Sequence, residues 1–209
     1  MEINEKLLNK LDNGREYRSM TMEVRAAEDG EMVVEGYATT FNEPYMLGER
    51  HGYKVLEKIA PTAFNNCDMR DVIMQYDHEG RVFARNKNGT LSLVVDDIGL
   101  KIIADLGGTD IGRQLYQEIK GGYTDKMSFG FVVEDDEVEE YTDDQGIRIA
   151  VRTITAIKKL YDVSAVSLPA NDMTSISARK FADGVIEQFA AERLKRNKQI
   201  QKIKLLMEV

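Results

Sequence analysis

The chain between Tyr17 and Pro169 consists mainly of short stretches in which apolar and polar residues alternate. A period of two is typical of strands with one buried face and one face in water. Turn residues separate roughly seven or eight such stretches. Only two central segments have helical features, too few for repeated strand–helix–strand units. The sequence therefore predicts a mainly β protein of the α+β class, built as an antiparallel barrel or a curled sheet.

The two central helical segments begin with recognisable start signals. Pro61 is well placed to open a short helix, because proline is favoured at the first helical position. In the segment TDIGRQLYQEIKGG, Thr109 or Asp110 can cap a second helix, and the closing glycine pair ends it.

Both ends of the chain also have helical composition. Apolar residues at helical spacing between residues 2 and 12 predict a short N-terminal helix. Beyond Gly184 the chain contains no glycine or proline, which predicts a C-terminal amphipathic helix. We expect an N-terminal helical arm at residues 1–14, a central β domain at residues 15–180 and a basic C-terminal helix at residues 181–209.

Charge and cysteine content limit the classes of partner. The 209 residues carry 28 Lys and Arg against 36 Asp and Glu, which argues against bulk binding to nucleic acid. Residues 180–209 are locally basic, which suits contact with an acidic partner or with the chain's own acidic body. The single cysteine, Cys67, excludes an internal disulfide and fits a reducing, cytosolic compartment. We find no membrane-length apolar run and no nucleotide-binding glycine loop, so we expect no membrane partner and no cofactor.

Three segments from distant parts of the chain contain the residue types of nucleophilic catalysis. His78 lies in MQYDHEG, Ser128 in DKMSFGF and Asp162 in KLYDVSAVSLPAND. Serine is a weak nucleophile unless a base lies within hydrogen-bond reach, and a carboxylate can orient that base. The three residues therefore supply a candidate base, nucleophile and orienting acid.

His78 also has an ordinary structural interpretation. In a strand from Val72 to His78, the imidazole would share a face with Met74 and Tyr76, and Asp77 would point to the other face. Such a histidine could simply be buried and hydrogen-bonded to backbone groups.

Ser128 and Asp162 have ordinary interpretations as well. Ser128 could be a plain strand serine beside Gly130, where backbone or substrate could approach closely. Asp162 would share a face with Leu160, and a carboxylate on an apolar face costs several kcal/mol unless it is paired. A histidine ring could pair with it, and so could a basic neighbour: Arg152, Lys158 or Lys159.

Five segments, in order, resemble the caudoviral prohead (capsid maturation) serine protease family: VEGYATTFNEPY, EKIAPTAF, MQYDHEG, GRQLYQEIKGGYTDKMSFGF and LYDVSAVSLPAND. They lie between residues 34 and 171, roughly two thirds of the chain. That family is related in fold to the herpesvirus maturation protease, assemblin. The resemblance therefore implies a closed antiparallel β-barrel of about seven strands with flanking helices.

The resemblance also implies an activity, a serine endopeptidase with His78, Ser128 and Asp162 as its catalytic residues. Backbone N–H groups and Arg152 are candidate oxyanion-hole donors. Members of the family cleave scaffold protein, or the scaffolding part of the capsid protein, and also themselves. The expected substrate is thus phage scaffold or major capsid protein, inside the immature prohead in the host cytoplasm, and the enzyme is a possible homo-oligomer.

Two other classes of protein fit the same residues. One is a non-catalytic structural barrel that associates with the capsid or its scaffold through the basic C-terminal helix. The other is a small-ligand-binding barrel of the lipocalin kind. A fluorophosphonate probe discriminates them from an enzyme, because only an activated serine would be labelled.

Overall fold

The structure is a computed structural model that describes residues 15–20, 25–26, 31–167 and 176–207. The N-terminal helix predicted at residues 2–12 lies outside the described residues. Within them the chain forms eleven strands, more than the roughly seven or eight predicted. The strands are β1 (Glu16–Met20), β2 (Arg25–Ala26), β3 (Val33–Thr40), β4 (Tyr45–Arg50), β5 (Tyr53–Ile59), β6 (Ile73–Tyr76), β7 (Glu79–Arg85), β8 (Leu91–Val95), β9 (Gly99–Asp105), β10 (Lys126–Thr142) and β11 (Arg148–Val166).

The strands form two sheets. The larger sheet has seven strands in the order β1-β10-β11-β5-β4, with β6 also paired to β11 and β7 paired to β6. The smaller sheet has four strands in the order β2-β3-β9-β8. Within the described residues, backbone strand pairing between the two sheets is limited to an isolated bridge from Phe41 to Ile59.

The prediction of a closed antiparallel β-barrel is therefore wrong, because neither sheet closes on itself within the described residues. Both sheets instead contribute side chains to one main core. The sheet is also not purely antiparallel, since β11 runs parallel to β5 and to β6. Parallel neighbours need long connections, which strand alternation within each segment does not reveal.

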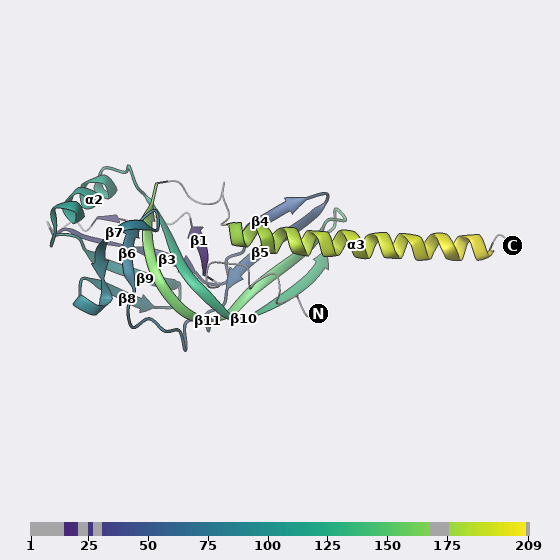
Figure 1. Ribbon diagram of the computed structural model, residues 1–209, viewed down its shortest axis with the longest axis horizontal. Helices are drawn as coiled ribbons and strands as arrows, with labels where there is room; N and C mark the ends of the chain where they lie inside the picture. The colour runs from purple at the N-terminus through teal and green to yellow at the C-terminus, as the bar shows by residue number, and fades with distance from the viewer. Residues whose placement is uncertain (1–14, 21–24, 27–30, 168–175, 208–209) are drawn as a thin grey trace.

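The long β10–β11 hairpin is the central element of the larger sheet (Figure 1). Asp143 closes its turn, because its side-chain oxygen accepts hydrogen bonds from the N–H groups of Gln145 and Ile147. Gly146 supplies a backbone φ of 80°, a value that glycine adopts without steric cost. The acidic stretch at residues 134–142, which precedes the turn, forms the outer part of β10.

Apolar side chains form two cores. The main core lies between the sheets and under α2 (Asp110–Lys120), and it includes Met127, Phe129 and Phe131 of β10. A second cluster forms where α3 (Ile176–Met207) crosses β4 and β5. The main core therefore packs one face of β10 tightly, which leaves its other face for polar side chains.

The structure confirms the predicted helix at α2. The Thr109 hydroxyl caps it by accepting a hydrogen bond from the Gly112 N–H, and Leu115 and Ile119 are buried. The short helix expected at Pro61 is not formed, and residues 61–66 make a series of turns instead. The short helix η2 (Asn86–Asn88) connects β7 to β8.

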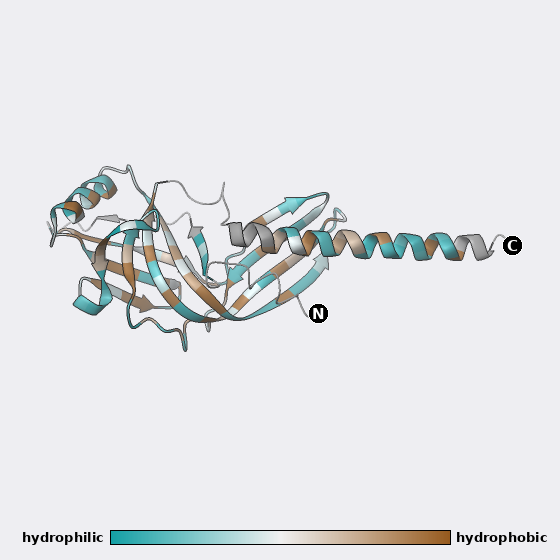
Figure 2. Cartoon of the chain, in the orientation of Figure 1, coloured by the Kyte–Doolittle hydropathy of each residue, from teal (hydrophilic) through white to brown (hydrophobic). Residues whose placement is uncertain are grey.

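Helix α3 confirms the predicted C-terminal helix and extends well beyond the sheets (Figure 1). Its first turns bury Phe181, Val185 and Phe189 against the body. The projecting part is largely hydrophilic, although Ile200 and Ile203 are exposed on it (Figure 2). Neither helix of the described residues is long and apolar enough to cross a membrane.

Replacing Phe189 by alanine should detach α3 from the sheets. The Phe189 ring is 1% exposed, lies 5.6 Å from the Tyr53 ring centroid, and stacks under the Arg148 guanidinium. Phe→Ala in a core costs about 3–5 kcal/mol of unfolding free energy, which urea denaturation would measure. Leu194→Ala, at an exposed position on the same helix, should change it by less than about 0.5 kcal/mol. Equal effects of the two variants would contradict the packing described.

Candidate active site

His78 projects from a tight turn rather than from a strand. Strand β6 ends at Tyr76, and Asp77 and His78 have positive φ values of 49° and 61°. Two-residue hairpin loops need this backbone, which Asp and His adopt more readily than most residues. The prediction of a strand running through His78 is therefore wrong, and so is the assignment of His78 to a strand face.

Asp77 fastens this turn to β11. Its N–H donates to the Ala165 carbonyl, and its carboxylate accepts hydrogen bonds from the N–H and hydroxyl of Ser167. The Asp77 carboxylate is therefore occupied in holding the turn. The anchored turn directs the His78 ring toward β10 and β11.

The three candidate residues meet in the structure. The His78 Nδ1 atom lies 2.5 Å from Asp162 Oδ1, and its Nε2 atom lies 2.5 Å from Ser128 Oγ. Ser128 is fully buried and Asp162 is 2% exposed. Arg152 was one of the basic residues expected as an alternative partner of Asp162, but its guanidinium pairs with other carboxylates. The carboxylate therefore contacts one imidazole nitrogen and the hydroxyl contacts the other.

A bulge in β11 gives Asp162 this position. Gly130 pairs with Asp162 and Phe131 pairs with Leu160, so Tyr161 is an extra residue in the ladder. Because neighbours on β10 face opposite sides, Asp162 lies on the face of Gly130 and Leu160 on the core face of Phe131. The prediction that Asp162 shares a face with Leu160 is therefore wrong.

Because Gly130 has no side chain, the Asp162 carboxylate and the Tyr17 ring occupy the space beside it, which leaves no room there for a substrate. A Cβ atom at this position would lie 2.3 Å from Asp162 Oδ2 and 2.7 Å from Cε1 of Tyr17. The space beside Ser128 is thus filled by the carboxylate and by an aromatic ring. A glycine is needed here because any larger residue would displace one of these groups.

Two further residues contact the imidazole, and sequence reasoning missed both. The Ser164 hydroxyl donates to Asp162 Oδ1 at 3.0 Å and lies 3.2 Å from His78 Nδ1. The Tyr17 ring centroid lies 4.5 Å from that of His78. Ser164 could have been found from its spacing, two residues after Asp162 on the same strand face. Tyr17 could not, because only tertiary pairing brings β1 beside β10.

The geometry allows a defined proton arrangement. If Asp162 accepts the Nδ1 proton, the Nε2 atom of His78 becomes the acceptor for the Ser128 hydroxyl. An imidazole held in this tautomer can remove the proton of an attacking serine. In the described part of the chain, no group of three or more His, Cys, Asp or Glu side chains is placed to hold a metal ion.

Strand β1 covers the hydroxyl. Its residues pair with Met127–Phe131 of β10, and Ser19 lies directly opposite Ser128. The Ser128 hydroxyl donates to the Arg18 carbonyl oxygen at 2.8 Å. The full burial of Ser128 is therefore consistent with β1 as its cover.

A buried network of charges holds β1 in place. The Arg18 guanidinium pairs with Glu57 and with Glu16, and Arg152 donates to the same two carboxylates. Burial alone would raise the pKa of Glu16, but Arg18 and Arg152 outweigh it and lower that pKa to about 2. Arg152 also donates to Asp136, so its guanidinium serves carboxylates and is a poor candidate for an oxyanion-hole donor.

Two other side chains of reactive types, His51 and Cys67, lie outside this cluster. His51 is exposed in a turn, where its Nε2 atom lies 3.1 Å from Arg50 Nε. Burial raises the pKa of the Cys67 thiol to about 11, which keeps it protonated and poorly reactive. Neither His51 nor Cys67 forms an observed hydrogen bond with Ser128, His78 or Asp162.

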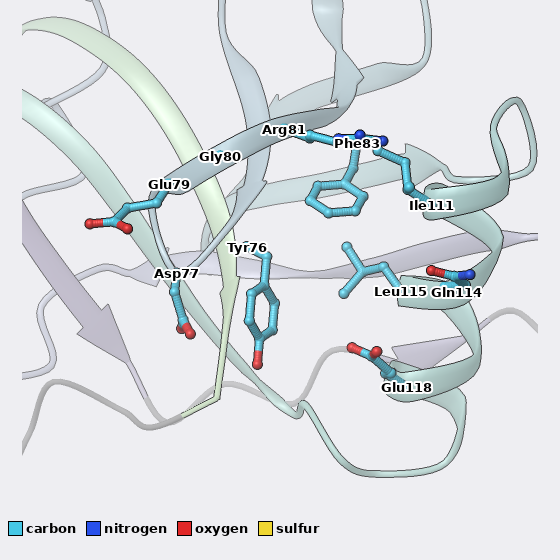
Figure 3. A pocket seen from close by; sticks show the side chains of 10 residues that line it. All are labelled: Tyr76, Asp77, Glu79, Gly80, Arg81, Phe83, Ile111, Gln114, Leu115 and Glu118. Carbon is cyan, nitrogen blue, oxygen red and sulfur yellow. The ribbon is translucent and has the colours of Figure 1, made fainter.

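A cavity of about 600 Å³ lies beside the turn that carries His78. Tyr76, Asp77 and Phe83 line one side, and Leu115 and Glu118 of α2 line the other (Figure 3). Ser128, His78 and Asp162 do not line it. The cavity therefore adjoins the site through the turn but does not contain its reactive atoms.

Replacing Gly130 by alanine should destabilise the protein. The new Cβ would overlap the Asp162 carboxylate, and overpacking costs about 1–3 kcal/mol of unfolding free energy. Urea denaturation measures the change. The matched control is Gly108→Ala, where no atom lies within 4 Å of an added Cβ. Equal stability of both variants would contradict the close approach at Gly130.

Lowering the pH should weaken the contribution of Glu16 to the free energy of unfolding. Because its folded-state pKa of about 2 lies below the ordinary value of 4.5, ionised Glu16 stabilises the folded chain fully above pH 4.5. This contribution is lost as pH falls from 4.5 toward 2. The difference in unfolding free energy between the native chain and Glu16→Gln should shrink over that range. The exposed Glu49→Gln variant is the control, and a pH-independent difference at Glu16 would refute the assignment.

Comparison with known proteins identifies the family. The sequence matches the caudovirus prohead serine protease family over residues 20–187, which include all three meeting residues. It is 30% identical to the prohead protease of Enterobacteria phage HK97 over 168 residues, 78% of this chain and 67% of that protein. No solved structure matches, so the relation in fold to the herpesvirus maturation protease stays a prediction. The chain belongs to the caudovirus prohead serine protease family.

Proposed function

We propose that this chain is a serine endopeptidase of capsid maturation. Its substrates are phage scaffold protein or the scaffolding segment of the capsid protein, and the chain itself, within the prohead. Family membership supports peptide hydrolysis in that setting. The observation that carries the proposal is the unbroken line of contacts from Asp162 through His78 to Ser128.

Acyl transfer begins at Ser128. Its Oγ attacks the carbonyl carbon of the scissile peptide while His78 Nε2 takes the hydroxyl proton. Asp162 keeps the other ring proton on Nδ1 and stabilises the imidazolium that forms. The bond between the carbonyl carbon and the leaving nitrogen then breaks, and His78 gives its proton to the departing amine. The product is an ester between Ser128 and the new C-terminus of the substrate.

Water completes the cycle. A water molecule transfers a proton to His78 Nε2 as its oxygen attacks the ester carbonyl. The ester bond breaks, and the proton returns to Ser128. Donors for the oxyanion are expected from backbone N–H groups, because Arg152 is occupied by three carboxylates.

The position of Asp162 supports its role as the orienting acid. Asp162 reaches Nδ1 of His78 because the bulge at Tyr161 turns its carboxylate to the correct face. Ser164 donates to the same carboxylate oxygen and so helps fix its orientation. We expect Ser164 to be a positioning residue rather than a catalytic one.

Ser128→Ala should abolish processing while the protein stays folded. Removal of a nucleophilic serine lowers acyl-transfer rates by about 10³-fold or more. Gel electrophoresis of capsid protein from proheads assembled with each variant measures the processing. The expected result is full-length substrate with Ser128→Ala and normal processing with Ser92→Ala, an exposed strand serine of β8.

Normal processing by Ser128→Ala would refute the assigned nucleophile. Fluorophosphonate labelling gives a second measurement, since labelling of the native chain must disappear with Ser128→Ala. A native chain that is never labelled and never processes substrate would favour the non-catalytic, shell-associated alternative.

A further inference from the structure

Strand β1 occupies an edge at which another extended segment could bind. Among the described residues it is the last strand of the larger sheet, and its only ladder partner there is β10, along Met127–Phe131. Without β1, the backbone of β10 on either side of Ser128 would be an open sheet edge. Extended peptides bind such edges by adding a strand. All of β1 except Met20 also precedes the family match, which begins at residue 20.

The backbone of β1 brings a peptide group to the candidate nucleophile. The Arg18 carbonyl oxygen lies 2.8 Å from Ser128 Oγ, so a peptide group of β1 contacts the hydroxyl directly. The hydroxyl has one proton, which it cannot donate to both this oxygen and His78 Nε2. The docked β1 therefore both covers Ser128 and competes for its proton.

The side chain of Arg18 enters a pocket made by other strands. Its Nε and terminal nitrogen donate to the two carboxylate oxygens of Glu57 at 2.5 and 3.0 Å, a bidentate arrangement. Glu57 is fully buried on β5, and the Tyr45 hydroxyl of β4 also donates to it. Such a pairing fixes both the position and the type of the inserted side chain.

The charge of this pocket favours a cation. Apart from β1 itself, its ionised groups are the carboxylates of Glu57 and Asp136 and the guanidinium of Arg152. When β1 is withdrawn, Arg18 and Glu16 leave together, and the two negative groups that remain against one positive group carry one negative charge. Glu57 then keeps Arg152 as a partner but loses the bidentate contact with Arg18. An incompletely paired buried carboxylate is costly, so an arginine or lysine from another segment would be bound in the place of Arg18.

We propose that β1 stands in for substrate. This inference rests on the proposed function. An extended substrate segment pairs with β10 in the place of β1 and inserts a basic side chain into the pocket of Glu57. Glu57 is then a specificity-determining residue, and β1 must leave before substrate enters. The substrate class is an unfolded or edge-exposed protein segment with arginine or lysine at the position of Arg18.

The test measures the rate of fluorophosphonate labelling of Ser128 in the full chain. Arg18→Ala should raise this rate about tenfold or more, since the loss of about 1.4 kcal/mol of docking energy corresponds to that factor. A peptide with the sequence of residues 15–20, REYRSM, should slow labelling of the variant when added in trans. The same peptide carrying Arg18→Gln should not slow it.

Controls separate local release of β1 from general loosening. Arg70→Ala removes an exposed ion pair with Asp68 and should label at the native rate. Arg18→Lys keeps the charge but loses the bidentate contact, so it should label at an intermediate rate even if Arg18→Ala folds poorly.

Two results would overturn this inference: native-rate labelling of both Arg18 variants, or equal protection by the two peptides. Failure of the proposed function looks different, because labelling would then be absent from every variant or would persist in Ser128→Ala.

Discussion

The antiparallel ladder between β10 and β11 is the interaction on which the site depends. It places Ser128 opposite Ser164 and Gly130 opposite Asp162, on the face away from the packed phenylalanines of β10. The bulge at Tyr161 changes the face of β11 at the one point where a carboxylate is required. The core on one side of the ladder holds the polar side in register, because slippage by one residue would exchange the two faces.

The third residue comes from a different kind of element. His78 sits on a strained two-residue turn, and Asp77 ties that turn to the end of β11. Backbone with positive φ in non-glycine residues persists only where surrounding contacts enforce it, and it is frequent at functional sites. The imidazole thus reaches two strands of the ladder without belonging to either.

Parts of this arrangement were predictable because they depend on local chemistry. The cap at Thr109 and the helix α2 follow from residue spacing alone. The three candidate residues were recognisable by their types, and the structure brings them together. The barrel was not predictable in this way and proved wrong, because closure and parallel pairing depend on which distant strands meet. The strand face of Asp162 was also wrong, since a bulge adds one residue that alternation does not register.

The amino-acid sequence by itself determined the mainly β class, the apolar face of α2 and the identity of a serine, a histidine and an aspartate suited to acyl transfer. The tertiary structure alone decided that β1 lies against β10, that Arg18 enters the pocket of Glu57, and that the Ser128 hydroxyl is covered. The spacing of apolar residues indicates which face of one segment is buried and which face is exposed to water. Contacts between segments far apart in the chain depend on the free energy of the whole packed molecule, which no local pattern contains.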